Sequence, residues 1–217
     1  MTLFLTSSPS GCPFEPGPDI PVLDTRNHFV ANLRAVWPDH AVLGLAIAAD
    51  PYAYEQNDEM CRVFAQSFAN AHLPLTALIP CDARNAEEIG SLLPQSGFVM
   101  LCGGHVPTQN HFFAQLGLPG LFHNYHGIVL GVSAGSMNAA HIVYAAPEEP
   151  GEAADPHASC PTTSSSGIMC WTGRRWRISP LPTAKSGIFS LCRTARISCA
   201  PTAARRCTAE AGTLRTG

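Results

Sequence analysis

The stretch Gly127–Asn138 reads Gly-Ile-Val-Leu-Gly-Val-Ser-Ala-Gly-Ser-Met-Asn and decides the fold. Its apolar residues Ile128–Leu130 predict a buried strand, and Ser136–Tyr144 predicts a helix shortly after it. Gly131–Gly135 joins the two with the pattern Gly-x-Ser-x-Gly, which is typical of a sharp turn between a strand and a helix. A strand that passes at once into a helix indicates a parallel sheet with helices packed on it.

The other residues before 150 repeat this alternation of strands and helices. Short apolar runs predict strands, and apolar residues at three- and four-residue steps predict the helices between them. We expect strands at Thr2–Ser7, Ala41–Ala48, Leu73–Pro80 and Gly97–Cys102, helices at Tyr54–His72, Asn85–Leu93 and Val106–Leu116, and an extended loop at Pro9–Pro21. Right-handed crossovers between these strands would give a three-layer α/β/α domain with a mostly parallel sheet.

The composition changes abruptly after residue 150. Residues 1–150 contain four Arg and no Lys and carry a formal charge of −9, whereas residues 151–217 carry +6. Five of the nine Cys also follow residue 156. We therefore expect an α/β domain over residues 1–155 and a poorly ordered tail over residues 156–217, because the tail matches no helix or strand pattern. A sheet without its final strands would keep an unpaired edge.

The overall composition excludes several classes of protein. Charged residues make up 13% of the chain, about half the usual share, which excludes a coiled coil or a charge-rich disordered chain. No run reaches the roughly 18–20 apolar residues of a membrane-spanning helix, and the first residues lack the basic region of a signal peptide. We expect a cytoplasmic protein that binds neither membrane nor nucleic acid. The sequence has no phosphate-binding glycine loop and no zinc-type cysteine spacing, so no cofactor or metal is expected.

Two loops at the ends of predicted strands carry the candidate chemistry, because ligands of parallel α/β sheets bind at the carboxyl ends of the strands. The turn after the last predicted strand would expose the hydroxyl of Ser133 as a nucleophile, with the N–H of Ala134 facing an oxyanion. The second loop reads Leu-Cys-Gly-Gly-His, and Gly103 and Gly104 would let backbone N–H groups approach a substrate carbonyl. Both motifs have simpler interpretations, since Gly-x-Ser-x-Gly arises by chance and Gly-Gly often marks a plain turn.

The candidates for a general base are histidines, each of which could equally be an ordinary surface residue. Those near the two loops are His105, His111, His123, His126 and His141. The cysteines before residue 150 are expected to be buried free thiols, namely Cys12, Cys61, Cys81 and Cys102.

Gly131–Asn138 (GVSAGSMN) and Leu101–His105 (LCGGH) together resemble the dipeptidase E and cyanophycinase family of serine peptidases. The resemblance covers about residues 30–150. It implies the class I glutamine amidotransferase-like fold, a short peptide substrate, Ser133 as nucleophile, and an oxyanion hole at Gly103, Gly104 and Ala134. Serine at the turn argues against glutamine-dependent amidation, for which the related enzymes use cysteine.

Two other functions compete with this peptidase prediction. One is a truncated, non-catalytic protein, and the other is an esterase of the α/β-hydrolase class, which also uses Gly-x-Ser-x-Gly. The acidic peptides that the family takes would need cations, for which the candidates before residue 150 are Arg26, Arg34, Arg62 and Arg84.

The family pattern also implies a histidine in a Leu-Pro-His-Tyr strand, about 30–40 residues after the serine. This chain has none in frame, but a shifted reading frame offers one. If the third base of each codon is read with the first two of the next, Ser159–Ser164 can encode Leu-Pro-His-Tyr-Gln, and Ser190–Ser198 can encode Ala-Leu-Pro-Asp-Gly-Ser-Tyr-Leu. We therefore hypothesise a frameshift near residues 156–159, which leaves His157 as the in-frame candidate base.

Overall fold

The computed structural model describes residues 1–10, 22–140, 176–178 and 195–199. Its strands form one sheet in the order β3-β2-β4-β5-β1-β7-β6. Pairing is parallel from β3 to β1 and antiparallel for β7 and β6, so the sheet is mostly parallel, as predicted. The strands are β1 (Thr2–Thr6), β2 (Val42–Ile47), β3 (Leu75–Cys81), β4 (Phe98–Leu101), β5 (Ile128–Val132), β6 (Trp176–Ile178) and β7 (Ala195–Cys199).

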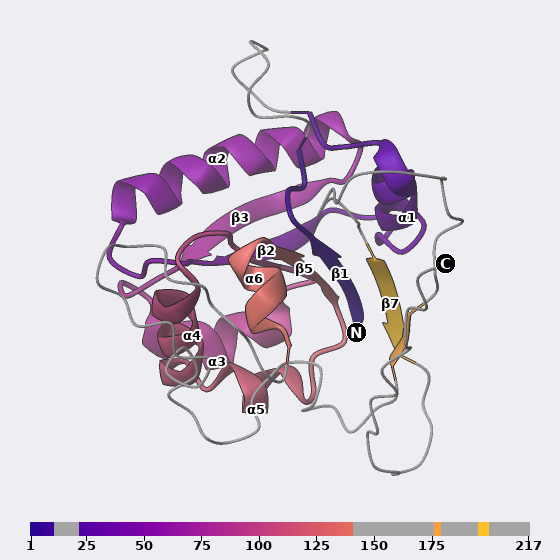
Figure 1. Ribbon diagram of the computed structural model, residues 1–217. Helices are drawn as coiled ribbons and strands as arrows, with labels where there is room; N and C mark the ends of the chain where they lie inside the picture. Colours follow the sequence, from indigo (N-terminus) through magenta and orange to yellow (C-terminus); the bar gives the residue numbers. More distant parts are fainter. Residues whose placement is uncertain (11–21, 141–175, 179–194, 200–217) are drawn as a thin grey trace, which may run out of the picture.

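Helices cover both faces of the sheet, which confirms the predicted three-layer α/β architecture (Figure 1). On one face α1 and α2 pack against Phe4, Phe98 and Met100, and on the other α3, α4 and α5 pack against Leu3, Val99 and Leu101. Neighbouring strand residues thus point to opposite cores, as the two-residue period of a strand requires. The helices are α1 (Phe29–Arg34), α2 (Tyr54–Asn70), α3 (Ile89–Leu92), α4 (Val106–Gln115), α5 (Leu118–Phe122) and α6 (Ala134–Asn138).

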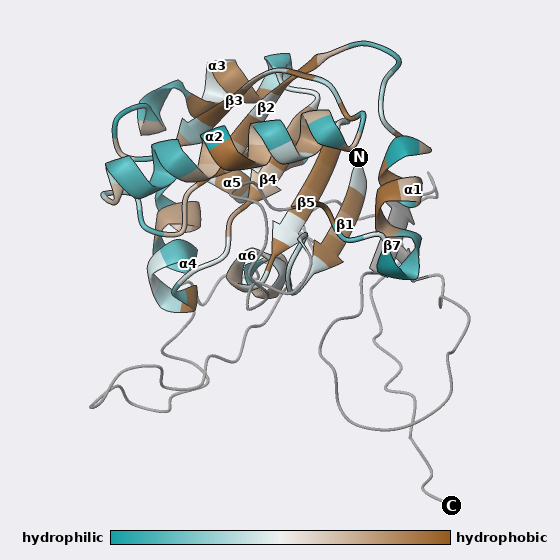
Figure 2. Cartoon of the chain, turned by 90° about the horizontal axis from the view of Figure 1, so that it is seen from above, coloured by the Kyte–Doolittle hydropathy of each residue, from teal (hydrophilic) through white to brown (hydrophobic). Residues whose placement is uncertain are grey.

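Short 3₁₀ turns stand at Arg26–His28, Ala86–Glu88 and Leu93–Gln95. The last two flank α3, so the predicted helix Asn85–Leu93 is only one turn of α-helix between two tighter turns. Figure 2 shows hydrophobic residues along the central strands and hydrophilic stretches on α2. Within the described residues, no helix is long and apolar enough to cross a membrane.

The tail contributes two strands, contrary to our expectation that it matches no strand. β7 pairs antiparallel with β1, with Leu3 opposite Ile197, and β6 pairs with β7. The sheet therefore continues beyond β1, at a place where loss of the final strands would have left an unpaired edge. Ala195–Cys199 reads Ala-Arg-Ile-Ser-Cys, and this alternation of apolar and polar residues has the two-residue period of a strand. The rest of the tail lies outside the described residues.

The strand order places three carboxyl-terminal ends side by side. β5 lies between β4 and β1, with Leu101 of β4 opposite Gly131 and Thr6 of β1 opposite Val132. The loops that follow these three strands therefore leave the same edge of the sheet. They contain Ser7 and Ser8, the Gly103–Gly104 pair and Ser133, which are far apart in the sequence.

Candidate active site

The turn at Ser133 is sharp and strained. β5 ends at Val132, α6 begins at Ala134, and Ser133 between them has φ 47° and ψ −111°. A non-glycine residue in such a conformation costs on the order of 1–3 kcal/mol and needs surrounding structure to hold it. The Ser133 N–H donates to the carbonyl of Thr6 at 2.8 Å, and the Ser133 carbonyl accepts from the N–H groups of Ser136 and Met137 at 2.9 and 3.1 Å. The side chain of Ser133 is exposed.

The glycines on either side of Ser133 are required by close packing. A Cβ at Gly131 would lie 2.9 Å from the Cα of Ser136, and a Cβ at Gly135 would collide with the carbonyl oxygen of Leu101 in β4. A larger residue at either position would push α6 away from the sheet. The structure therefore contains the tight strand–turn–helix that the Gly-x-Ser-x-Gly pattern predicts.

The Gly-Gly loop lies directly against this turn. A Cβ at Gly103 would come within 3.3 Å of the Cβ of Ser133, and a Cβ at Gly104 would collide with Ala49. Both glycines are exposed. Within the described part of the chain, the N–H groups of Gly103, Gly104 and Ala134 donate to no acceptor. The structure thus brings together the residues that the sequence predicts for a nucleophile and an oxyanion hole.

A buried polar network that we did not predict ties the two loops together. Gln109 of α4 is fully buried, and its Nε2 donates to the carbonyl of Cys102 at 2.6 Å. Asn138 of α6 donates from Nδ2 to Gln109 Oε1 at 3.0 Å and to the carbonyl of Val106 at 3.1 Å. Its Oδ1 also accepts from Asn110 Nδ2 at 3.2 Å. Buried polar groups that satisfy one another in this way fix the loops relative to each other. No local pattern in the sequence marks Gln109 and Asn138 as partners, because they lie on two helices that only the fold brings together.

A second unpredicted contact ties α6 to β1. The Ser136 hydroxyl donates to the carbonyl of Thr6 at 2.8 Å, and the same oxygen accepts from the Thr6 N–H at 3.1 Å. Thr6 is buried. Because the Thr6 carbonyl also accepts from the Ser133 N–H, the end of β1 fixes both the turn and the helix after it.

The base for Ser133 is not found in the described residues. Among these residues, no side chain forms a hydrogen bond with the Ser133 hydroxyl. His105 is half-buried, and its Nδ1 is 2.7 Å from Thr108 Oγ1, whereas His111, His123 and His126 are exposed. The other two candidates, His141 and His157, lie outside the described residues.

The arginines considered for an acidic substrate all contact the protein itself. Their partners are Asp24 for Arg26, the carbonyl of Ala71 for Arg34, Glu59 for Arg62, and Asp58 with Asp82 for Arg84. The Arg84 guanidinium is bound most fully, because it reaches both carboxylates and lies 4.9 Å from the ring centre of Tyr54. These contacts do not favour a role for the four side chains in binding an acidic peptide.

Asp82 holds the loops after β2 and β3 in place. Its carboxylate is fully buried and accepts from Arg84 and from Asn57, whose Nδ2 also donates to the carbonyl of Asp50. Burial alone would raise the pKa of the Asp82 carboxyl, but these hydrogen bonds together outweigh it and hold the pKa below its usual value. Asp82 is therefore ionised at neutral pH and anchors the loop that begins at Asp50.

The expectation of buried free thiols is confirmed for three cysteines, and the fourth, Cys12, lies outside the described residues. Burial raises the pKa of Cys61 and of Cys81 to about 12 and raises that of Cys102 as well. Such thiols are poor nucleophiles and poor metal ligands. No cluster of three or more His, Cys, Asp or Glu among the described residues is arranged to hold a metal ion.

Comparison with protein-family models and with curated proteins finds no match to this chain. The fold and the site define an α/β protein with an exposed serine in a strained turn beside a Gly-Gly loop. The resemblance to the dipeptidase E and cyanophycinase family stays a prediction that rests on the quoted motifs.

Proposed function

We propose that this protein is a serine-type peptidase that hydrolyses peptide or amide bonds of short peptides, on a class I glutamine amidotransferase-like fold. The observation that carries the proposal is the exposed Ser133 hydroxyl, held in a strained turn against Gly103. Strain of this kind destabilises the fold and is found mostly at functional sites. Among the described residues, the N–H groups of Gly103, Gly104 and Ala134 donate to no acceptor, which suits them to hold an anionic oxygen.

The reaction would run through a covalent acyl intermediate. Ser133 Oγ attacks the carbonyl carbon of the scissile bond while a histidine takes its proton, and the backbone N–H groups stabilise the developing oxyanion. The histidine then protonates the leaving amine, and water releases the acid by the reverse sequence of proton transfers. Each of these steps uses groups of the protein and water only.

Labelling with a fluorophosphonate probe tests the nucleophile directly, because the probe reacts with activated serines. The full chain should be labelled once, at Ser133, as located by peptide mass spectrometry. Ser133→Ala should abolish labelling and any hydrolysis, with a loss of about a thousandfold or more. The matched control is Ser91→Ala, which removes an exposed hydroxyl of α3 and should leave labelling unchanged. Equal labelling of the Ser133→Ala protein would contradict the proposal.

A non-catalytic protein is the second candidate, and it is favoured by the lack of a base for Ser133 among the described residues. A serine of ordinary pKa is a weak nucleophile without such a base. Under the frameshift hypothesis the printed chain should be nearly inactive. A chain restored to the shifted frame from about residue 159, with any missing linker supplied, should be faster by several orders of magnitude on short peptides.

The two candidates can be separated by experiment. Resequencing the gene and mass spectrometry of the tail test the frameshift, which a single intact frame encoding the printed residues would exclude. A restored chain that folds but hydrolyses none of a panel of dipeptides and esters would exclude the peptidase. Hydrolysis of esters alone would favour the esterase.

We also propose a cytoplasmic location. The three buried cysteines of the described residues carry free thiols, as is typical of proteins in a reducing compartment. Fractionation of cells that express the native gene would test this, and recovery in the secreted fraction would contradict it.

A further inference from the structure

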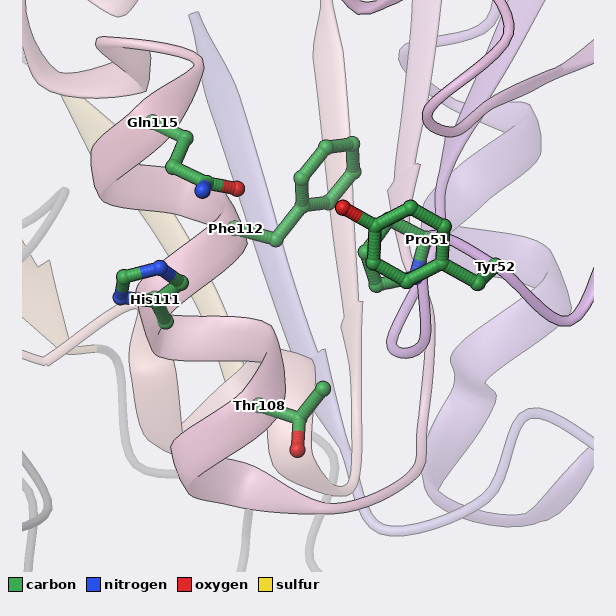
Figure 3. Close-up of a pocket in the computed structure, with 6 residues that line it drawn as sticks. All are labelled: Pro51, Tyr52, Thr108, His111, Phe112 and Gln115. Carbon is green, nitrogen blue, oxygen red and sulfur yellow. The ribbon is translucent and has the colours of Figure 1, made fainter.

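An open pocket of about 380 Å³ lies between the loop after β2 and helix α4. Figure 3 shows Pro51 and Tyr52 on one side and the side chains of α4 on the other, with Phe112 pointing between them. The helix contributes Thr108, His111, Phe112 and Gln115, whose spacing places them on one face of α4. The volume falls in the range that is usual for small-ligand sites.

The ring of Tyr52 is exposed although its backbone is fixed. Tyr52 is 70% exposed, the highest value among the large hydrophobic residues described. The Tyr52 N–H donates to Asp50 Oδ1 at 2.9 Å. The Pro51 carbonyl accepts from the Ala83 N–H at 3.0 Å, and the Asp50 carbonyl accepts from Asn57 Nδ2 at 3.0 Å. The ring is therefore presented to solvent on an ordered loop. A preordered aromatic side chain can bind a ligand with little loss of conformational entropy.

Both walls of this pocket continue into the loop that contains Gly103 and Gly104. On one side, Ala49 contacts Gly104 and stands two residues before Pro51. On the other, Thr108 is bonded to His105, the residue after Gly104. A molecule in the pocket would therefore lie beside the candidate oxyanion hole.

The residues that line the pocket favour an aromatic ligand. None of the six lining residues is Asp, Glu, Lys or Arg. Pro51, Tyr52 and Phe112 offer flat apolar surfaces, which suit the face or edge of an aromatic ring. Thr108, His111 and Gln115 add polar groups, and the nearby cation of Arg84 is already bound to two carboxylates.

We propose that this pocket is a specificity subsite that binds the aromatic side chain of a short peptide. The inference rests on the proposed function, because it assigns a substrate class to the site at Ser133. It also departs from the acidic substrates implied by the family resemblance. Peptides with an aromatic residue should bind more tightly than peptides with a small or acidic residue.

The test measures binding of three dipeptides to the full chain by calorimetric titration, with Ser133→Ala as the background so that no turnover occurs. Glycyl-phenylalanine should bind saturably and about fivefold more tightly than glycyl-alanine or glycyl-aspartate. Adding Tyr52→Ala should lower the affinity for glycyl-phenylalanine by about fivefold, and Tyr52→Phe should retain most of that affinity. Gln115→Ala should weaken binding by about twofold, whereas the matched control Gln66→Ala, on the exposed side of α2, should not.

The pocket and the proposed function can fail separately. Three results would each overturn the proposed subsite. They are equal binding of the three dipeptides, no saturable binding of glycyl-phenylalanine, and an unchanged affinity for glycyl-phenylalanine in the Tyr52→Ala protein. Fluorophosphonate labelling at Ser133 does not depend on that pocket. Labelling without aromatic preference overturns the subsite alone. Tyr52-dependent binding without labelling, in the printed chain and in the chain restored to the shifted frame, overturns the peptidase while the aromatic site stands.

Discussion

Replacement of Ser133 by glycine should stabilise the protein while it removes the candidate nucleophile. Ser133 has φ 47° and ψ −111°, which costs on the order of 1–3 kcal/mol for a residue with a Cβ. Glycine relieves that strain but loses about 0.5–1 kcal/mol more conformational entropy on folding. The free energy of unfolding should therefore rise by about 1 kcal/mol, which corresponds to a rise of about 2–4 °C in Tm for a chain of this size.

Ser133→Ala separates strain from the loss of the hydroxyl. Alanine keeps the Cβ and hence the strain, and the hydroxyl it removes has no hydrogen-bond partner among the described residues. Its stability should therefore stay within about 0.5 kcal/mol of the parent protein. The difference between the glycine and alanine variants measures the backbone strain at the turn.

The assay is urea unfolding of the full chain, followed by circular dichroism, for the parent and each variant. His72→Gly is the matched control, because His72 has φ 57° just after α2 and lies away from the candidate site. The His72→Gly substitution should raise the free energy of unfolding by up to about 1 kcal/mol and should not change probe labelling at Ser133. A glycine variant at Ser133 that is no more stable than the alanine variant would refute the assignment of a strained turn.

Three further predictions concern contacts around the site. Ser136→Ala should cost about 1 kcal/mol in urea unfolding, because it removes the hydroxyl that bonds both the N–H and the carbonyl of Thr6. The lowered pKa of Asp82 means that its contacts stabilise the fold above about pH 4 and are lost as the pH falls through that lower pKa. Asp82→Asn should thus cost about 1–3 kcal/mol at pH 7, and this cost should shrink as the pH is lowered below about 4; a cost that does not change with pH down to acid unfolding would contradict the ionisation of Asp82. Cys81, with a pKa of about 12, should resist iodoacetamide at pH 8 until urea unfolds the chain, and native alkylation mapped by mass spectrometry would show that it is accessible.

The central strands could be predicted from the sequence because both of their faces are buried. β2, β4 and β5 each read as a continuous apolar run, and the predicted ranges agree with the observed strands to within a few residues. α1 and α5 were missed because helices of six and five residues are too short to show a helical period. β7 was missed although Ala195–Cys199 alternates apolar and polar residues, because five residues of alternation in a tail of unusual composition are a weak signal.

The candidate site could be predicted only where its signal is local. Gly103, Gly104 and Ser133 stand out because glycine patterns after apolar strands mark tight turns. Thr6 and Gln109 carry no such pattern, since their roles arise only when β1, β4 and β5 become neighbours. Their contacts are set by strand order, which a single sequence does not specify residue by residue.

The position of Ser133 does not depend on the base that would activate it. Its turn is held by Thr6, Ser136 and Met137, and the loop beside it is held by Gln109 and Asn138. All five precede residue 140, whereas both the in-frame candidate His157 and the histidine of the shifted reading follow it. A change of frame in the tail would therefore remove the base and leave the serine and the Gly-Gly loop in place. For the same reason, a restored tail would bring its imidazole to a turn that is already formed, although it would also replace the residues of β6 and β7 that extend the sheet from β1.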